Sequence, residues 1–253
     1  MASPGHVAAL YRHPVKGFTP ERLASADLVA GGFFPCDRLY AVEDGPSGFD
    51  PDAPAFVPKT RFAVLAKIAE VAKVRSAYDE DAGVLHAEAE GLEPFDGRLD
   101  EPEGRAAFAG WLAKLLGEAA AGPLKVVHAA GHRFTDHPAG YVSVINLESV
   151  RELEGRIGRT IDPLRFRANL YVEGWPAWSE LEAAGRDVAL GGARARVLKS
   201  IVRCAATTVN PHTAERDIDV PAALFENFGH VLCGIYVEVT SPGRVGEGDA
   251  AIL

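Results

Sequence analysis

The chain has 253 residues, of which 47% are hydrophobic, which is enough to bury a full core in one large domain or two closely packed smaller ones. Its formal net charge of -9 argues against a nucleic-acid-binding surface, because contact with phosphates requires a basic face, although a local basic pocket remains compatible with it. The three cysteines form no C-x-x-C pair, so neither a disulfide framework nor an iron–sulfur cluster is expected.

No targeting or membrane-spanning segment is predicted. Residues 1–6 lack a charged stretch followed by a long apolar one, so we expect no signal peptide. No apolar run approaches the roughly 20 residues that cross a bilayer. Because free cysteines persist in a reducing compartment, we expect a cytoplasmic protein with no membrane or nucleic-acid partner.

The first hundred residues are predicted to form short strands separated by glycine- and proline-rich turns. Lys16 lies in a turn after the first strand, Arg38 would lie on the polar face of the third, and residues 44–58 are a loop. The pattern indicates a small barrel or sandwich, to which we assign residues 1–104. The predicted strands are residues 7–10, 24–29, 37–42, 62–74 with a break near Lys67, and 84–88.

Helices join the strands in residues 105–253, which we assign to a second domain. The clearest helix is 105–116, because its apolar residues recur at helical spacing and Gly117 follows. The fold class is therefore mixed α/β and β-rich, with barrel cores and appended helices. The other predicted elements are helices at 147–156 and 219–228 and strands at 125–128, 141–145, 187–190, 194–201 and 231–240.

Two polar stretches in this second half are candidate binding elements. His132, Asp136 and His137 crowd a loop that could flank a pocket; the two histidines have no third metal ligand in register. Ser143 and Asn146 lie where a strand meets a helix, and the first N–H groups of a helix have no internal partner. Both are candidate phosphate contacts, with helix capping as the alternative.

Alternating basic residues mark the segment 161–172. Arg165, Arg167 and Asn169 are two residues apart, so in a strand they would share one face. Two guanidinium groups and an amide suit a phosphate, a carboxylate or the polar edge of a heterocycle. A salt-bridged exposed face is the alternative interpretation.

The segment 200–211 carries the candidate reactive thiol. An apolar β-branched run leads to Arg203 and Cys204, and the segment ends at a turn-forming Asn-Pro pair. Cys204 is thus predicted at or near the end of a strand, close to the hydroxyls of Thr207 and Thr208. Positive charge favours a thiolate, so Cys204 could be a metal ligand or a nucleophile. The alternative is a small buried hydrophobic residue.

Taken together, these motifs resemble the MOSC family, whose members are similar to the C-terminal domain of molybdenum cofactor sulfurase and to the mitochondrial amidoxime-reducing component. The resemblance covers nearly the whole chain, and its strength lies in the joint order of the motifs. In chain order these are His13-Pro14-Val15-Lys16-Gly17, Asp37-Arg38, Arg165-Phe166-Arg167-Ala168-Asn169, residues 174–181, residues 203–213 and residues 245–249.

The resemblance implies a MOSC β-barrel preceded by an N-terminal MOSC-type β-barrel region, and a molybdenum cofactor (Mo-molybdopterin) whose metal is bound by Cys204. It also implies that basic residues hold the pterin phosphate and that Asn169 contacts the pterin. Val202 stands where relatives can have serine. The full set that we assign to cofactor binding is Lys16, Arg38, Ser143, Arg165, Arg167, Asn169, Arg203, Thr207 and Thr208.

The resemblance further implies reduction of N-hydroxylated small molecules such as amidoximes, hydroxylamines and N-hydroxylated bases. No cluster-binding C-x4-C-x2-C extension is present, so the electrons would come from a separate electron-transfer protein. Asp162 and His212, with the two threonines of the cysteine segment, are candidates for the substrate side. The alternatives are a carrier of cofactor or sulfur that uses Cys204, and a cysteine hydrolase that pairs Cys204 with His212 or His230.

Overall fold

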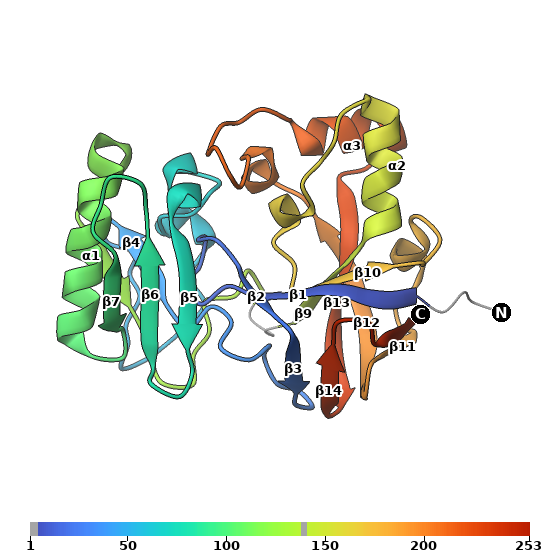
Figure 1. Ribbon diagram of the computed structural model, residues 1–253, viewed down its shortest axis with the longest axis horizontal. Coiled ribbons are helices and arrows are strands. Elements are labelled where there is room, and N and C mark those ends of the chain that lie inside the picture. Colours follow the sequence, from blue (N-terminus) through green and yellow to red (C-terminus); the bar gives the residue numbers. More distant parts are fainter. Residues whose placement is uncertain (1–4, 138–140) are drawn as a thin grey trace.

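The structure, a computed structural model, describes residues 5–137 and 141–253. Residues 1–4, part of the stretch in which no signal peptide is predicted, lie outside this description. Figure 1 shows two lobes side by side: a smaller one from the blue-to-green middle of the chain, and a larger one that includes both ends.

The larger lobe is a closed barrel. β1 (Gly5–Arg12) pairs with both β15 (Ala250–Ile252) and β10 (Leu170–Glu173), which closes the sheet, and β2 (Glu21–Leu23) extends it beyond β1. β9 (Val142–Asn146) and β10 are parallel, whereas the other barrel pairs are antiparallel. In order around the barrel, its seven strands are β10 (Leu170–Glu173), β9 (Val142–Asn146), β13 (Leu232–Ser241), β12 (Ala193–Val202), β11 (Asp187–Leu190), β15 (Ala250–Ile252) and β1 (Gly5–Arg12).

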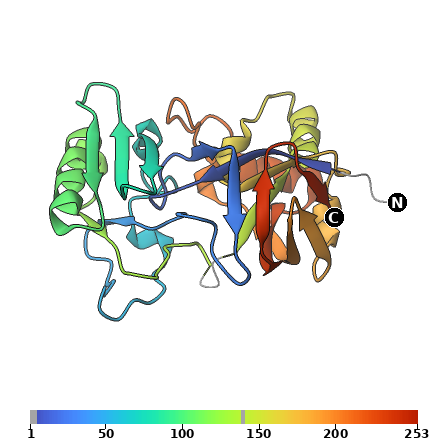
Figure 2. The ribbon, with the colours of Figure 1, turned by 60° about the horizontal axis from the view of Figure 1, so that its bottom comes forward.

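The barrel interior is filled by every second side chain along its strands. Along β12, Ala193, Ala195 and Val197 are buried while Arg194 and Arg196 are exposed, the pattern of a strand with one face on a core. At one end of the barrel, β3 (Ser25–Leu28) pairs with β14 (Gly243–Gly246), and Figure 2 shows these two strands side by side.

Two helices cover the outer face of the parallel strands. α2 (Leu147–Ile157) begins at Asn146, whose side chain accepts a hydrogen bond from the Glu148 N–H, and α3 (Val220–Phe228) ends at Gly229 with a φ of 73°. Their apolar residues pack with outward-facing residues of β9 and β10 in one cluster. Both helices are confirmed close to the predicted positions.

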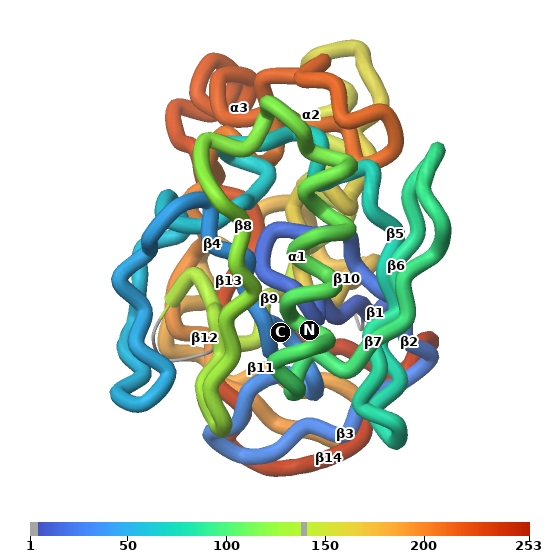
Figure 3. Tube along the Cα trace, turned by 90° about the vertical axis from the view of Figure 1, so that its left-hand side faces the viewer, coloured from blue at the N-terminus to red at the C-terminus, as the bar shows by residue number. Residues whose placement is uncertain are grey.

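The smaller lobe packs a third helix, α1 (Pro102–Leu116), against short strands. β4 (Ala41–Asp44) pairs with β8 (Leu124–Val127). β5 (Arg75–Asp79), β6 (Val84–Glu88) and β7 (Phe95–Arg98) form an antiparallel sheet. Figure 3 shows α1 between β7 and β8. The predicted helix is confirmed, and it starts a few residues earlier because a proline fits the first turn.

Among the described residues, the chain forms three α-helices and a strand-rich remainder, which confirms the predicted β-rich mixed fold. No helix in the described part of the chain is long and apolar enough to cross a membrane. The division into residues 1–104 and 105–253 stays a prediction. Short 3₁₀ helices complete the fold: η1 (Lys59–Arg61), η2 (Ala69–Lys73), η3 (Gly117–Ala119), η4 (Pro163–Phe166), η5 (Ser179–Glu182) and η6 (Ala205–Thr208).

Two predicted strands in the first half are wrong. The strand predicted at 37–42 begins only at Ala41, because Arg38 adopts a left-handed φ of 52° in a turn. That turn is fixed by the Asp37 carboxylate, which accepts a 2.7 Å hydrogen bond from the His13 backbone N–H. Residues 62–74 form 3₁₀ helix and loop, since Phe62 makes only an isolated bridge and no neighbouring strand pairs with the rest.

The predicted strand through Arg165, Arg167 and Asn169 is also wrong. η4 occupies this stretch because Asp162 caps it, accepting a 2.8 Å hydrogen bond from the Leu164 N–H. Arg167 then takes a left-handed φ of 55°, and β10 starts only after Asn169. The three side chains therefore do not share a strand face.

His13 lies in the turn after β1 and is completely buried. Neither ring nitrogen has a hydrogen-bond partner in the described structure, and Nδ1 lies 3.4 Å from Asp37 Oδ1. Burial, reinforced by the charge of Arg167, lowers the pKa of His13 from 6.5 to about 3, although Asp37 acts in the opposite direction. The imidazole is therefore neutral in the folded protein at neutral pH.

This burial predicts acid lability. Between pH 6.5 and about 3, the unfolded state binds one proton at His13 that the folded state does not. The free energy of unfolding should therefore fall with decreasing pH, with His13 contributing about 1.4 kcal/mol per pH unit. In His13→Phe, urea denaturation at a series of pH values should show a free energy of unfolding that falls less steeply with decreasing pH. The difference in slope from wild type corresponds to one proton. Parallel curves for the two proteins would contradict the assignment.

Candidate functional site

A cavity of about 300 Å³ lies where the two lobes meet, and Cys204 is in its wall. The turn after β1, residues 59–66, the loop before β9 and the ends of β12 and η4 all contribute side chains. Although the whole chain has a net charge of -9, seven basic side chains line this cavity against one carboxylate. They are Lys16, Arg38, Lys59, Arg165, Arg167, Lys199 and Arg203, with Asp136 as the acid.

Cys204 is held at the junction of a strand and a turn. β12 ends at Val202, and Cys204 is the extended residue that precedes η6, which confirms its predicted place near a strand end. Thr207 fixes this junction, since its N–H and its Oγ1 donate to the Cys204 carbonyl at 3.0 and 2.9 Å. The thiol is half-buried, with its sulfur 3.2 Å from the Lys59 amino group.

Arg203 anchors the cysteine segment to its neighbours. Its Nε donates to the Cys233 carbonyl at 2.8 Å, and its Nη1 donates to the Phe166 carbonyl at 2.9 Å. The absent side chain of Gly234 makes room, because a Cβ there would lie 2.5 Å from the Val144 carbonyl and 3.1 Å from the Arg203 guanidinium. The guanidinium therefore binds backbone carbonyls of β13 and η4, and it fixes the position of the adjacent thiol.

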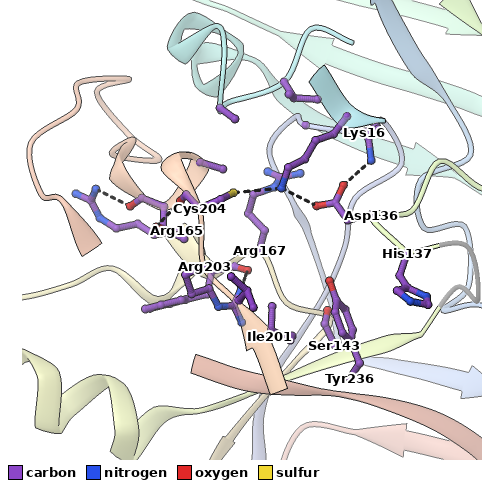
Figure 4. Close-up of a pocket in the computed structure, with 18 of the residues that line it drawn as sticks. Lys16, Asp136, His137, Ser143, Arg165, Arg167, Ile201, Arg203, Cys204 and Tyr236 are labelled. Carbon is purple, nitrogen blue, oxygen red and sulfur yellow. Dashed lines mark hydrogen bonds and ion pairs between the residues drawn. The ribbon is translucent and has the colours of Figure 1, made fainter. Parts of the chain in front are cut away.

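A chain of charges crosses the cavity from Lys16 to Cys204, as Figure 4 shows. Lys16 Nζ donates to Asp136 Oδ1 at 2.5 Å and to the Phe134 carbonyl at 2.8 Å. The other Asp136 oxygen lies 3.7 Å from the Lys59 Nζ. One carboxylate is thus shared between two lysines, of which only the second reaches the thiol.

The pKa values along this chain follow burial and charge. Burial would raise the pKa of Asp136, but Lys16 and Lys59 hold it well below its usual range. Burial lowers the pKa of Lys16 despite the opposing effect of Asp136. Burial also acts to lower the pKa of Lys59, yet Asp136 and Cys204 outweigh this and leave it raised.

Arg38 and Arg167 form a second cationic group in the wall. Arg38 is paired with Asp37, and its Nη2 donates to the Arg167 carbonyl at 3.3 Å. Arg167 donates to the Phe18 carbonyl, and its pKa is lowered to about 10 by burial, then by the neighbouring Arg38. Two guanidinium groups that line the same cavity favour binding of an anion there.

Arg165 takes a different direction. Its guanidinium points away from Cys204 in Figure 4, donating to the Thr208 carbonyl at 3.0 Å and pairing with Asp217 at 2.6 Å. Its Nε is buried without a hydrogen-bond partner in the described structure. A buried, unused N–H of this kind is a candidate contact for a polar ligand group.

Of Cys204 and the residues assigned to cofactor binding, the cavity brings together all except Asn169 and Thr208. The buried Asn169 accepts hydrogen bonds from the Ser143 N–H and Oγ and donates to the Tyr11 carbonyl at 3.3 Å, which ties β9 to β1. Ser143 also lines the cavity. The proposed cofactor-binding roles of these residues stay predictions.

The candidate histidines lie elsewhere. His212 contacts Asp162 at 2.7 Å, and both line a separate cavity of about 560 Å³. His230 packs against Phe228 and is not among the residues that line the cavity of Cys204. Neither histidine is therefore placed to activate the thiol, and the hydrolase interpretation has no support from the geometry.

Other lining residues were not assigned to cofactor or metal binding from the sequence, among them Lys59, Asp136, Lys199 and Tyr236. Asp136 carried a signal, since it lies in the polar loop expected to flank a pocket. Lys199 and Tyr236 occur within correctly predicted strands and are paired across β12 and β13. Nothing local marks Lys59, because it reaches the thiol only through the contact between the lobes.

The donor set fits an anionic cofactor that contains a soft metal. A single thiol suits a soft metal, the lysines and arginines suit a phosphate, and the unused Arg165 N–H suits a heterocycle. Within residues 5–137 and 141–253, no group of three or more His, Cys, Asp or Glu side chains is arranged to hold a metal ion.

Comparison with known proteins gives the family. Residues 4–121 match the MOSC N-terminal beta barrel domain, and residues 131–251 match the MOSC domain. The chain therefore belongs to the MOSC-domain family, which is associated with binding of the molybdenum cofactor. No curated protein matches.

Two solved structures are similar at low identity. The YuaD protein of Bacillus subtilis is 16% identical with a TM-score of 0.46, over 99% of this chain and 94% of that chain. YiiM of Geobacillus stearothermophilus is 22% identical with a TM-score of 0.35, over 44% of this chain and 53% of that chain. Both TM-scores are too low to add to the fold assignment.

The hydrogen bonds of Arg203 predict a large effect on stability. Arg203→Ala would leave the Cys233 and Phe166 carbonyls without these donors, at about 1–3 kcal/mol for each unsatisfied buried group. Urea denaturation should show the corresponding loss in the free energy of unfolding. Arg194→Ala, at an exposed position of β12, the strand that leads to Arg203, is the matched control and should change it by less than about 0.5 kcal/mol. Equal effects of the two substitutions would contradict the role of Arg203.

Proposed function

We propose that this protein is a molybdenum-cofactor-dependent oxidoreductase that reduces N-hydroxylated compounds with electrons from a separate protein. One observation carries the proposal: a half-buried thiol lies in a cavity whose wall is strongly basic, in a protein that is acidic as a whole. Family membership supports the cofactor, and the resemblance to amidoxime-reducing proteins supports the substrate class.

Each part of the cavity would have its own task. Cys204 would ligate the metal, while Lys16, Arg38 and Arg167 would hold the phosphate. When bound, the cofactor would supply two-electron redox chemistry. Reduction of an N–OH group to N–H releases water and consumes two protons along with two electrons. Tyr236 lines the same wall, and because burial raises the pKa of its hydroxyl, this group stays protonated; we propose that it donates a hydrogen bond to the oxygen of the substrate.

A carrier of sulfur or cofactor is the second candidate, and one observation favours it. The Cys204 sulfur lies beside a cavity that also contains the amino group of Lys59, so a persulfide on it would have space and a cationic neighbour. Sulfur transfer needs a thiol that is free to exchange, whereas a thiolate that binds metal is occupied. Metal content therefore separates the two functions.

The reductase proposal predicts stoichiometric molybdenum and pterin in protein from molybdenum-replete cells. Cys204→Ala should lose most of the metal because its ligand is removed. Cys36→Ala is the matched control, since Cys36 is also half-buried but lies outside the cavity, and it should keep the metal. Mass-spectrometric metal analysis measures the molybdenum, and fluorescence after oxidative release measures the pterin, in wild type and in both variants.

Loaded wild-type protein should then reduce an amidoxime and a hydroxylamine with a chemically reduced viologen as donor. Wild-type protein that contains neither molybdenum nor pterin would overturn the reductase proposal. A mass increase of one sulfur atom on Cys204 in that metal-free protein would instead support the carrier.

A further inference from the structure

The structure places a lysine from the smaller lobe at the sulfur of the family's cysteine. Lys59 Nζ donates to Cys204 Sγ at 3.2 Å, across a separation of 145 residues in the sequence. The dashed lines between Cys204 and Asp136 in Figure 4 meet at this amino group. The contact joins the two lobes at the atom on which the proposed chemistry depends.

The backbone of Lys59 is well fixed. The Lys59 carbonyl accepts a 3.1 Å hydrogen bond from the N–H of Phe62, whose side chain is fully buried. The next residue, Ala63, donates to the Val42 carbonyl at 2.8 Å, which ties the segment to β4. The side chain of Lys59 itself is 37% exposed, so it reaches the sulfur from a rigid turn without being part of the core.

The other basic groups near the thiol have different partners. Lys16 donates to Asp136 and the Phe134 carbonyl, and Arg203 donates to backbone carbonyls. Lys199 lines the same cavity from β12, and no hydrogen bond from it to the sulfur is observed in the described structure. Within the described part of the chain, Lys59 is thus the cation that donates to the thiol.

An N–H donor and a positive charge at a ligating sulfur have a defined effect on a metal. They withdraw electron density from the sulfur and favour the reduced, more negative state of the centre; hydrogen bonds to sulfur ligands are one of the ways in which proteins set reduction potentials. We propose that Lys59 is a positioning residue that raises the reduction potential of the metal bound to Cys204. The proposal rests on the proposed function.

The test is a potentiometric titration of loaded protein, followed by the electron paramagnetic resonance signal of Mo(V), in wild type, Lys59→Met and Lys59→Arg. Lys59→Met should shift the one-electron equilibrium about tenfold toward the oxidised metal, which is about 59 mV lower in midpoint potential. Lys59→Arg keeps an N–H donor and the charge, so it should restore most of the wild-type potential.

Lys199→Met is the matched control, because it removes the same charge from the same cavity without removing a donor to the sulfur. Its shift should be less than half of that in Lys59→Met. Because Lys59 is on a surface turn, the variants should fold; Lys59→Gln, which keeps an N–H without the charge, should give an intermediate shift and provides a second variant.

The outcomes separate the two proposals. Wild-type metal content with an unchanged potential in both Lys59→Met and Lys59→Gln would overturn the role of Lys59 and leave the proposed function intact. Equal shifts of the midpoint potential in Lys199→Met and Lys59→Met would also overturn the role of Lys59, since loss of any positive charge from the cavity would then explain the shift. Wild-type protein without molybdenum would overturn both.

Discussion

Pairing of β1 with β10 on one side and β15 on the other is the interaction on which the site depends. It closes the barrel, so the first strand of the chain becomes a wall of a structure otherwise formed by residues 142–252. The turn that follows β1 carries His13 and Lys16, and it brings Lys16 into the wall of the cavity that contains Cys204. There Lys16 meets Asp136, which precedes β9, and Arg38 meets the backbone of Arg167. Without this closure Lys16 and Arg38 would not be held beside the lobe that carries Cys204.

The electrostatics of the cavity follow from this arrangement. Burying an unpaired charge costs several kcal/mol, so cations within the fold need partners. The structure gives these cations few acidic partners. Asp136 serves two lysines, Asp37 pairs with Arg38, Asp217 pairs with Arg165, and backbone carbonyls bind Arg203. The partners fix the side chains but leave the cavity wall with an excess of positive charge. An anion would complete this charge balance, which explains why a basic pocket occurs in an acidic protein.

The same arrangement explains how two lobes serve one thiol. The barrel supplies Cys204 and the groups that hold it, namely Arg203 and Thr207, whose hydrogen bonds go to backbone carbonyls. The smaller lobe supplies Lys59, which reaches the sulfur itself. Position is thus set by one lobe, and the electrostatic environment of the sulfur is modified by the other.

The sequence by itself determined the elements whose signals are local. Helical spacing and a following glycine located α1, an Asn cap followed by helical spacing located α2, and an Asp at the start with a closing glycine located α3. A β-branched run before an Asn-Pro turn placed Cys204 near a strand end. The types of residue in the site were also readable, since cations and a thiol grouped in short motifs indicate anion and soft-metal chemistry.

Tertiary structure decided the geometry of these residues. The alternation of Arg165, Arg167 and Asn169 suggested a strand, but a capped 3₁₀ turn turns Arg165 away from the thiol and makes Asn169 a brace between strands. Only the contact between lobes brings Lys59 to Cys204, because a hydrogen bond across 145 residues leaves no periodic pattern in a single sequence.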